Sequence, residues 1–147
     1  MTLIASKLEK EEKILQRAFL YVSFWIYRCL RYHYCCDSRP FSETVWPILP
    51  KRVVDVSQLA KGCINLVDGS SIRAPYCALS YRWQGNAVRT TEVSLAAFKR
   101  EIPISLLQSQ ITDAFLIANR LGIRYVWVDA LVSCPCTTYH SKICSFQ

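Results

Sequence analysis

The sequence predicts an α/β fold, with part of a parallel sheet preceded by a long amphipathic N-terminal helix. Residues 76–83 and 121–129 each have the pattern of a buried strand that ends in polar and aromatic residues. The stretch between them has helical periodicity. Strand, helix and strand in this order are typical of a βαβ unit with parallel strands and a right-handed crossover. The carboxyl ends of the two strands would therefore lie side by side.

The composition is that of a folded chain. Of its 147 residues, 52% are hydrophobic and 20% are charged, which excludes general disorder and fits one domain or part of one. The net charge of +7 is spread along the chain without a basic run, so we expect no specific nucleic-acid partner. The cysteines are expected to be reduced thiols of a cytoplasmic protein, because Cys77 lies within a predicted strand and the first residues lack a signal peptide's apolar core.

Residues 6–34 contain no Gly or Pro and carry an apolar stripe at helical spacing. We expect this stripe to pack against a folded domain, with binding to a membrane surface as the alternative. A transmembrane span is not expected, because the longest apolar stretch, residues 18–27, is shorter than the roughly 20 residues that a bilayer requires. The stripe consists of Leu8, Leu15, Ala18, Val22, Trp25, Cys29 and Tyr32.

The chain divides into four predicted regions. A helical lead-in is assigned to residues 1–36 and a linker punctuated by prolines to residues 37–52. Residues 53–131 hold the predicted sheet and its helices. The last region, residues 132–147, is an atypical tail with no helical or strand period.

Within the sheet region, two short β-prone runs precede the βαβ unit. Residues 53–56 and 63–67 are close enough to form a hairpin-like pair. Between the two main strands, a short helix is predicted around residues 95–99 and a longer one over residues 107–121. Gly122 suits the position just after that longer helix, where a left-handed backbone commonly ends a helix.

Three sequence blocks then follow a characteristic order. Residues 76–83 read Tyr-Cys-Ala-Leu-Ser-Tyr-Arg-Trp, Ile-Pro and Asp-Ala stand at 102–103 and 113–114, and residues 121–129 read Leu-Gly-Ile-Arg-Tyr-Val-Trp-Val-Asp. In these blocks the chain resembles the fungal heterokaryon incompatibility (HET) domain. The family's lead-in also has counterparts at Trp25, Ile26, Cys29, His33, Cys36, Leu49, Pro50, Arg52, Asp55 and Val56.

The resemblance implies a fold and a function. It implies a sheet similar to that of TIR domains and flavodoxin, and a role in fungal non-self recognition and programmed cell death signalling. It also implies protein partners or self-association. The alternative function is that of a TIR-like nucleotide (NAD) hydrolase, which fold-level likeness alone does not establish.

The chain departs from the family pattern at three places. Gln84 is inserted before Gly85, Gln108 stands where the family usually has Pro, and residues 132–136 replace a Cys-Ile-x-Gln-Asp-like segment. We interpret the chain as a C-terminally truncated HET domain that is inactive alone. Catalytic residues are therefore unknown, and enzymatic activity is not favoured, because the region where a TIR-like catalytic acid would lie is absent.

A truncated sheet would also be poorly covered. In this interpretation the strands within residues 76–83 and 123–129 lack neighbours and have an uncovered face. Side chains such as Tyr125 and Trp127 would then lose burial worth about 1.5–3 kcal/mol each. We therefore expect an isolated chain of marginal stability.

The candidate ligand-binding residues stand at the predicted carboxyl ends of the parallel strands, where open α/β sheets bind ligands. A hydroxyl, a guanidinium and a carboxylate between aromatic walls could hold a nucleotide or a ribose. Alternatively, the aromatic side chains belong to the core and the polar ones hydrogen-bond turns. Alternation along the strand separates even from odd positions, so the whole set cannot converge without a bend. The set comprises Ser80, Tyr81, Arg82, Trp83 and Asp129.

Two Cys/His groups have the residue types of zinc ligands, but we expect neither to bind metal. Cys29, His33 and Cys36 share a helix face without a fourth ligand. In the tail, the Cys-Pro-Cys spacing is shorter than zinc sites usually have. This second group is Cys134, Cys136, His140 and Cys144. No cofactor is expected, since no phosphate-binding or dinucleotide motif occurs.

Overall fold

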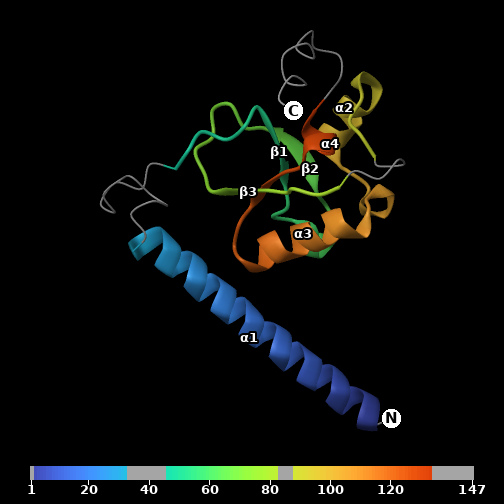
Figure 1. The fold of residues 1–147 in the computed structure, drawn as a ribbon. Coiled ribbons are helices and arrows are strands. Elements are labelled where there is room, and N and C mark those ends of the chain that lie inside the picture. The colour runs from blue at the N-terminus through green and yellow to red at the C-terminus, as the bar shows by residue number, and fades with distance from the viewer. Residues whose placement is uncertain (1, 33–45, 83–87, 134–147) are drawn as a thin grey trace. The chain divides into compact units, whose positions relative to one another are not determined.

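The computed structural model describes residues 2–32, 46–82 and 88–133. The chain forms two compact units, Met1–Val45 and Trp46–Gln147, which we describe separately. The first unit contains the helix α1 (Thr2–Tyr32), which confirms the predicted N-terminal helix (Figure 1). No Gly or Pro interrupts α1, and Arg31 lies in its last turn, where a cation suits the negative end of the helix dipole. Among the described helices, none combines the length and apolarity needed to cross a bilayer.

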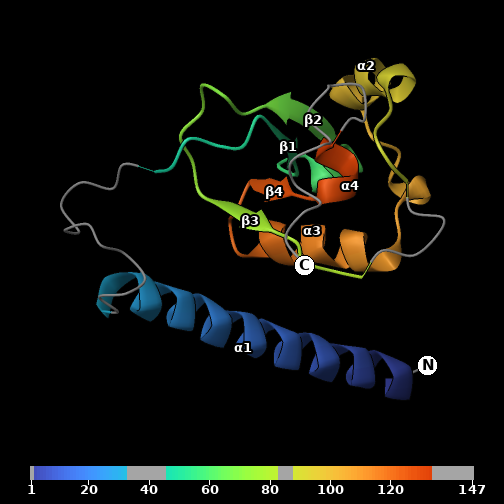
Figure 2. The same cartoon turned by 45° about the horizontal axis from the view of Figure 1, so that its top comes forward.

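The second unit is built on a four-stranded mixed sheet. Its strands are β1 (Arg52–Asp55), β2 (Asn65–Asp68), β3 (Tyr76–Ala78) and β4 (Tyr125–Trp127), in the order β2-β1-β4-β3. β3 and β4 are parallel, which confirms the predicted βαβ pairing, and β1 and β2 form the predicted hairpin-like antiparallel pair. Figure 2 shows β4 between β1 and β3.

The expectation of a parallel sheet is wrong for β1. This strand is antiparallel to β2 on one side and to β4 on the other, with Asp55 opposite Tyr125. The connection from β1 to β2 holds only the short turn η1 (Leu59–Lys61), and a parallel pair needs a crossover of a dozen or more residues. The hairpin therefore joins β4 through the free edge of β1 and gives the sheet its mixed character.

Among the described residues, four helical segments follow β3. α2 (Glu92–Arg100) begins at a capping box, in which the side chains of Thr91 and Ser94 each accept a hydrogen bond from the other's backbone N–H. The short turn η2 (Ile104–Leu106) leads to α3 (Ser109–Arg120). These two α-helices correspond to the helices predicted between the main strands.

Gly122 and α4 define the two ends of β4. Gly122 has a φ of +74° after α3, as predicted for a left-handed helix end. Directly after β4, the chain forms α4 (Asp129–Val132), which the sequence analysis did not predict. Val132, assigned to the tail from the sequence, is the last residue of this helix and is buried.

The larger hydrophobic core covers one face of the sheet. Val54 of β1 and Val126 of β4 point into it from the sheet, and Phe115 of α3 is fully buried at its centre. The helices also contribute Phe98, Ile111, Ala118, Leu131 and Val132, and the turn at η1 contributes Leu59. This face is therefore closed by α2, α3, α4 and η1.

A smaller cluster covers the opposite face, so the expectation that β4 would be uncovered is wrong. Leu49, Val53 and Tyr125 form its buried part, and residues 67–74 supply further apolar side chains. Leu49 is held by a hydrogen bond from its N–H to the carbonyl of Ile72 (2.8 Å). Residues 46–52, assigned to the linker from the sequence, thus take part in the sheet unit.

Gly69 makes the close packing of this second face possible. A Cβ atom at this position would lie 2.3 Å from the Pro50 carbonyl oxygen and 2.7 Å from the Leu49 Cβ. Both distances are far below van der Waals contact, so only glycine lets the two segments approach this closely.

Candidate functional site

The candidate site lies where β3 and β4 end. Because the strands are parallel, both carboxyl ends meet at the same edge of the sheet. The pairing continues one residue beyond β3, since the N–H of Leu79 donates to the carbonyl of Trp127 (2.9 Å). The segment after Leu79 and the start of α4 are therefore neighbours.

The structure divides the predicted site residues as the alternation implied. Ser80 and Arg82 are exposed, whereas Tyr81 is partly buried and packs against the larger core. Trp83 lies outside the described residues. Of the predicted set, Tyr81 and Asp129 come together, whereas nothing in the described structure brings the exposed Ser80 and Arg82 to them.

The Tyr81 hydroxyl lies near charged groups. Burial raises the pKa of Tyr81 above its ordinary value of 10.0, and the Asp129 carboxylate raises it further. The positive charge of Arg89 partly offsets this rise. Within the described residues, the hydroxyl oxygen is buried and makes no hydrogen bond of good geometry. A phenol, a carboxylate and a guanidinium thus surround one small region at the end of β3.

Asp129 is oriented by α4. Its Oδ1 accepts a hydrogen bond from the N–H of Ala130 (2.7 Å), which fixes the carboxylate at the first turn of the helix. Thr90, the residue after Arg89, is fully buried and forms hydrogen bonds with α4. Its N–H donates to the carbonyl of Ala130 (3.0 Å), and its hydroxyl donates to the carbonyl of Leu131. The segment that carries Arg89 is therefore held against the helix that carries Asp129.

Gln108 is a second polar residue with a buried atom that lacks a partner. Its Oε1 accepts no hydrogen bond from the described residues. Gln108 precedes the first turn of α3. Buried acceptors of this kind are uncommon in folded proteins and are often satisfied by water or a ligand.

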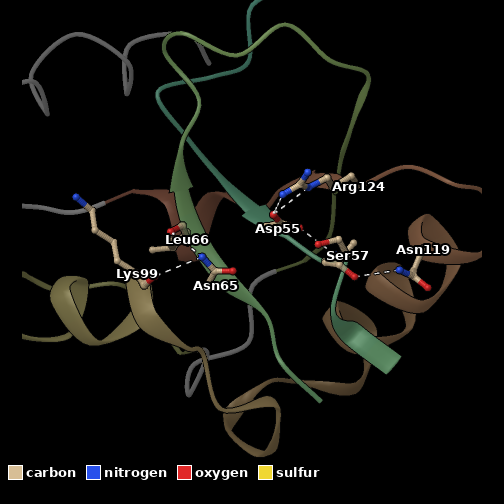
Figure 3. A network of polar contacts seen from close by, with 8 residues as sticks. Asp55, Ser57, Asn65, Leu66, Lys99, Asn119 and Arg124 are labelled. Carbon is tan, nitrogen blue, oxygen red and sulfur yellow. Dashed lines mark hydrogen bonds and ion pairs between the residues drawn. The ribbon is translucent and has the colours of Figure 1, made fainter. Parts of the chain in front are cut away.

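A separate polar network joins β1 to β4 (Figure 3). Arg124 donates to Asp55 Oδ2 from Nε (3.0 Å) and from Nη2 (2.6 Å). The N–H of Ser57 donates to Asp55 Oδ1 (2.9 Å), and Asn119 Nδ2 donates to the carbonyl of Val56 (3.0 Å). Burial alone would raise the pKa of Asp55, but these hydrogen bonds and the charge of Arg124 outweigh it, so the pKa lies below the ordinary 3.8.

This network is structural in character. Asp55 is buried and its carboxylate is fully engaged, so it is not available to a ligand. Another lead-in residue, Arg52, donates from Nε to the carbonyl of Val132 at the end of α4 (2.6 Å). The side chains of Arg52 and Asp55 thus hold the block that contains β4 and α4.

The predicted cysteine groups fall largely outside the described residues. Cys29 lies on α1, but His33, Cys36 and the tail group of Cys134, Cys136, His140 and Cys144 cannot be placed. Within residues 2–32, 46–82 and 88–133, no three His, Cys, Asp or Glu side chains form a possible metal site. Cys77 is a free thiol whose pKa is raised by burial, which makes it a poor nucleophile.

Sequence reasoning missed Arg89 and Thr90. Both were part of an undifferentiated polar connection, and their contacts reach residues about 40 positions further along the chain. The one local pattern in this segment is the pair Thr90-Thr91 before Glu92, and it predicts the start of a helix, which is α2.

Comparison with known proteins supports the family resemblance. The family model of the heterokaryon incompatibility protein (HET) matches residues 76–134. No curated protein and no solved structure matches the chain. The matched range begins at β3 and includes α2, α3, β4 and α4, so it contains the whole βαβ unit and the site at its end. Over residues 76–134, this chain is therefore similar to the heterokaryon incompatibility (HET) family.

Proposed function

We propose that the chain is a HET-type signalling and interaction domain that takes part in fungal non-self recognition and the cell death that follows it. The observation that carries this proposal is the coincidence of the family match with one structural block, from β3 to α4. In this proposal the protein is cytoplasmic, acts through protein partners or self-association, and has a sheet of the TIR and flavodoxin type.

The edge position of β3 supports an interaction role. β3 is the terminal strand of the described sheet, and Tyr76, Ala78 and Ser80 are exposed along it. An edge strand can pair with a strand of another chain, and its exposed side chains then select the partner. Arg82 adds a positive charge at the end of this surface.

Expression in a fungal host tests the proposal. The 147-residue chain alone should leave growth unchanged, because it needs a partner to signal. Co-expressed in excess with a full-length HET-domain protein that causes cell death, it should reduce that death by competing at the shared surface. Replacing Ala78 with Pro should abolish the competition, since proline removes a backbone N–H and alters the edge.

A matched change keeps the experiment specific. Val93 is the most exposed large apolar residue of α2, at 92%, and Val93→Asp should leave the competition intact. If co-expression does not alter cell death at any ratio, the interaction proposal is wrong. Growth arrest by the chain alone would show that it signals without a partner.

The alternative is a TIR-like hydrolase of NAD. The observation in its favour is the meeting of Tyr81 and Asp129 at the strand ends, with Arg89 close by. Two other acids lie at the ends of α2: Glu92 is its first residue, and Glu101 follows its last. Both side chains are exposed and are not part of this site. Asp129 is thus the carboxylate that could stabilise a developing positive charge on a ribose.

Nicotinamide release from NAD separates the two functions. The interaction proposal expects no turnover by the purified chain. Turnover that falls about 100-fold in Asp129→Asn, and is retained in Asp113→Asn, would favour the hydrolase. Asp113 is a suitable control because it is an exposed acid on α3.

A further inference from the structure

The second part of α1 has an unusual charge distribution. Residues 13–32 contain Lys13, Arg17, Arg28 and Arg31 but no Asp or Glu. The acids of this helix, Glu9, Glu11 and Glu12, all precede that stretch. About 30 Å of continuous helix therefore carries only positive charge.

The four cations share one side of the helix. At about 100° per residue, Lys13, Arg17, Arg28 and Arg31 fall within a sector of about 60°. On the other side, apolar side chains occupy an arc of about 140°. This arc consists of Ile14, Leu15, Ala18, Phe19, Val22, Trp25, Ile26 and Cys29.

The large apolar side chains of this stretch are exposed. Trp25 is 72% exposed and Ile14 is 59% exposed. Single exposed apolar residues are ordinary, but a continuous set of this size marks an interaction surface. Those on or bordering the apolar arc are Ile14, Leu15, Tyr21, Val22, Trp25, Ile26 and Tyr32, whereas Leu20, Phe24 and Tyr27 lie beside the cations.

Aromatic rings stand next to the cations. Arg28 lies over the ring of Phe24 (5.8 Å to the centroid), and Arg31 lies over the ring of Tyr27 (5.9 Å). Phe24, Tyr27, Arg28 and Tyr32 line a shallow hollow of about 260 Å³. Trp and Tyr side chains prefer the boundary between water and hydrocarbon, because they combine an apolar ring with a polar group.

We propose that residues 13–32 of α1 bind the surface of an anionic lipid bilayer, with the helix lying in the plane of the interface. The apolar arc enters the boundary between head groups and acyl chains, and the four cations reach the lipid phosphates on flexible side chains. This inference is independent of the function proposed for the β3–α4 block.

Charge complementarity selects this partner over a second copy of the chain. Two copies of residues 13–32 packed through their apolar arcs would bury those side chains, but the pair would carry eight cations with no acid to offset them. A nucleic acid would satisfy the cations but would leave the apolar arc in water. An anionic bilayer offers both a negative surface and an apolar layer beneath it.

Vesicle sedimentation with the full 147-residue chain tests the proposal. The chain should sediment with phosphatidylcholine vesicles that contain about 30% phosphatidylserine, and much less with phosphatidylcholine alone. The double change Arg28→Glu and Arg31→Glu should raise the lipid concentration for half-binding at least about tenfold, since each basic residue contributes to the attraction. Trp25→Ala should also weaken binding, and added salt should weaken it in the unaltered chain.

A second double change controls for net charge. Lys61→Glu and Arg100→Glu alter the total charge equally, at exposed positions of the sheet unit, and should shift half-binding by less than about twofold. Far-ultraviolet circular dichroism confirms that each variant keeps its helix content. The proposal is overturned if the unaltered chain does not sediment, if both double changes have equal effects, or if neutral and anionic vesicles bind equally. Self-association lost in the α1 variant without any lipid binding would identify a second copy as the partner instead.

Discussion

β3 and β4 are built from similar sequence blocks and pair with each other in register, yet they have opposite environments. Tyr125 and Val126 of β4 are buried on opposite faces of the sheet, and the strand is paired on both sides. Tyr76 and Ala78 of β3 are exposed, and in the described sheet only one side of β3 is paired. The difference shows that sheet position, rather than local sequence, decides which strand is buried and which is exposed.

The largest expected effect comes from a charge in each strand. Val126→Asp places a carboxylate in the main core and should cost more than about 4 kcal/mol, which leaves the chain unfolded or nearly so. Ala78→Asp, at an exposed position of β3, should cost less than about 1 kcal/mol. Urea denaturation followed by circular dichroism measures both. Equal losses would mean that the two strands carry similar structural weight.

The second expected effect concerns the smaller cluster that covers β4. Gly69→Ala should cost about 2–3 kcal/mol, because the new Cβ pushes residues 49–50 away from the sheet. Ser71→Ala, at an exposed position two residues later, should change stability by less than about 0.5 kcal/mol. Near-ultraviolet circular dichroism should report a changed environment of Tyr125 in the first variant alone. An unchanged stability of Gly69→Ala would show that this cover is dispensable.

The third expected effect is the loss of the ion pair between β1 and β4. Arg124→Ala should cost about 1–2 kcal/mol at pH 7, because it removes two hydrogen bonds from the buried Asp55 carboxylate. The cost stays this small because the Arg124 side chain is 57% exposed, so water screens the ion pair. Arg100→Ala, an exposed control on α2, should be neutral within about 0.5 kcal/mol.

The pH dependence of this third effect has a definite sign. The folded-state pKa of Asp55 is lowered, so its stabilising contribution is complete above the unfolded-state value of about 3.9. The contribution is lost as the pH falls through that value to the lower folded-state pKa. The free energies of unfolding of the unaltered chain and of Arg124→Ala should therefore differ less at about pH 2 than at pH 7. If the difference in unfolding free energy between the two proteins is the same at both pH values, the effect comes from packing of the Arg124 side chain.

The smallest expected effect is on the titration of Tyr81. Asp129→Asn should lower the pKa of Tyr81, because it removes a negative charge that disfavours the phenolate. With the folded-state pKa raised, the chain loses stability as the pH rises above about 10, where the unfolded tyrosine ionises first. Carbon-13 resonances of the tyrosine rings measure this pKa, and the Tyr81 signal is the one missing in Tyr81→Phe. Asp113→Asn should leave it unchanged.

Much of the fold could be predicted from local pattern. Helical spacing predicted α1 and α3, and Gly122 was predicted to end α3 because few other residues adopt its left-handed backbone. Alternation predicted that Tyr81 would separate from Ser80 and Arg82. These features depend on residues close together in the chain.

The remainder depends on distant contacts that no local pattern encodes. The antiparallel pairing of β1 with β4 joins residues 69 positions apart at Asp55 and Arg124. α4 begins directly after a strand at Val128, whose side chain cannot cap a helix, so no start signal was present. Arg89 joined the candidate site for a similar reason, since the neighbouring Thr90 anchors its segment to α4.

The position of β1 between β2 and β4 has a consequence for synthesis of the chain. Arg124 is added to the growing chain 69 residues after Asp55. At roughly 5–20 residues per second, β1 waits about 3–14 s for its second neighbour, with only the hairpin partner β2 available. During that interval Val53 and Val54 remain open to wrong pairing. Slow translation of residues 56–124 would lengthen this exposure, and a ribosome-associated chaperone that covers β1 would shorten it.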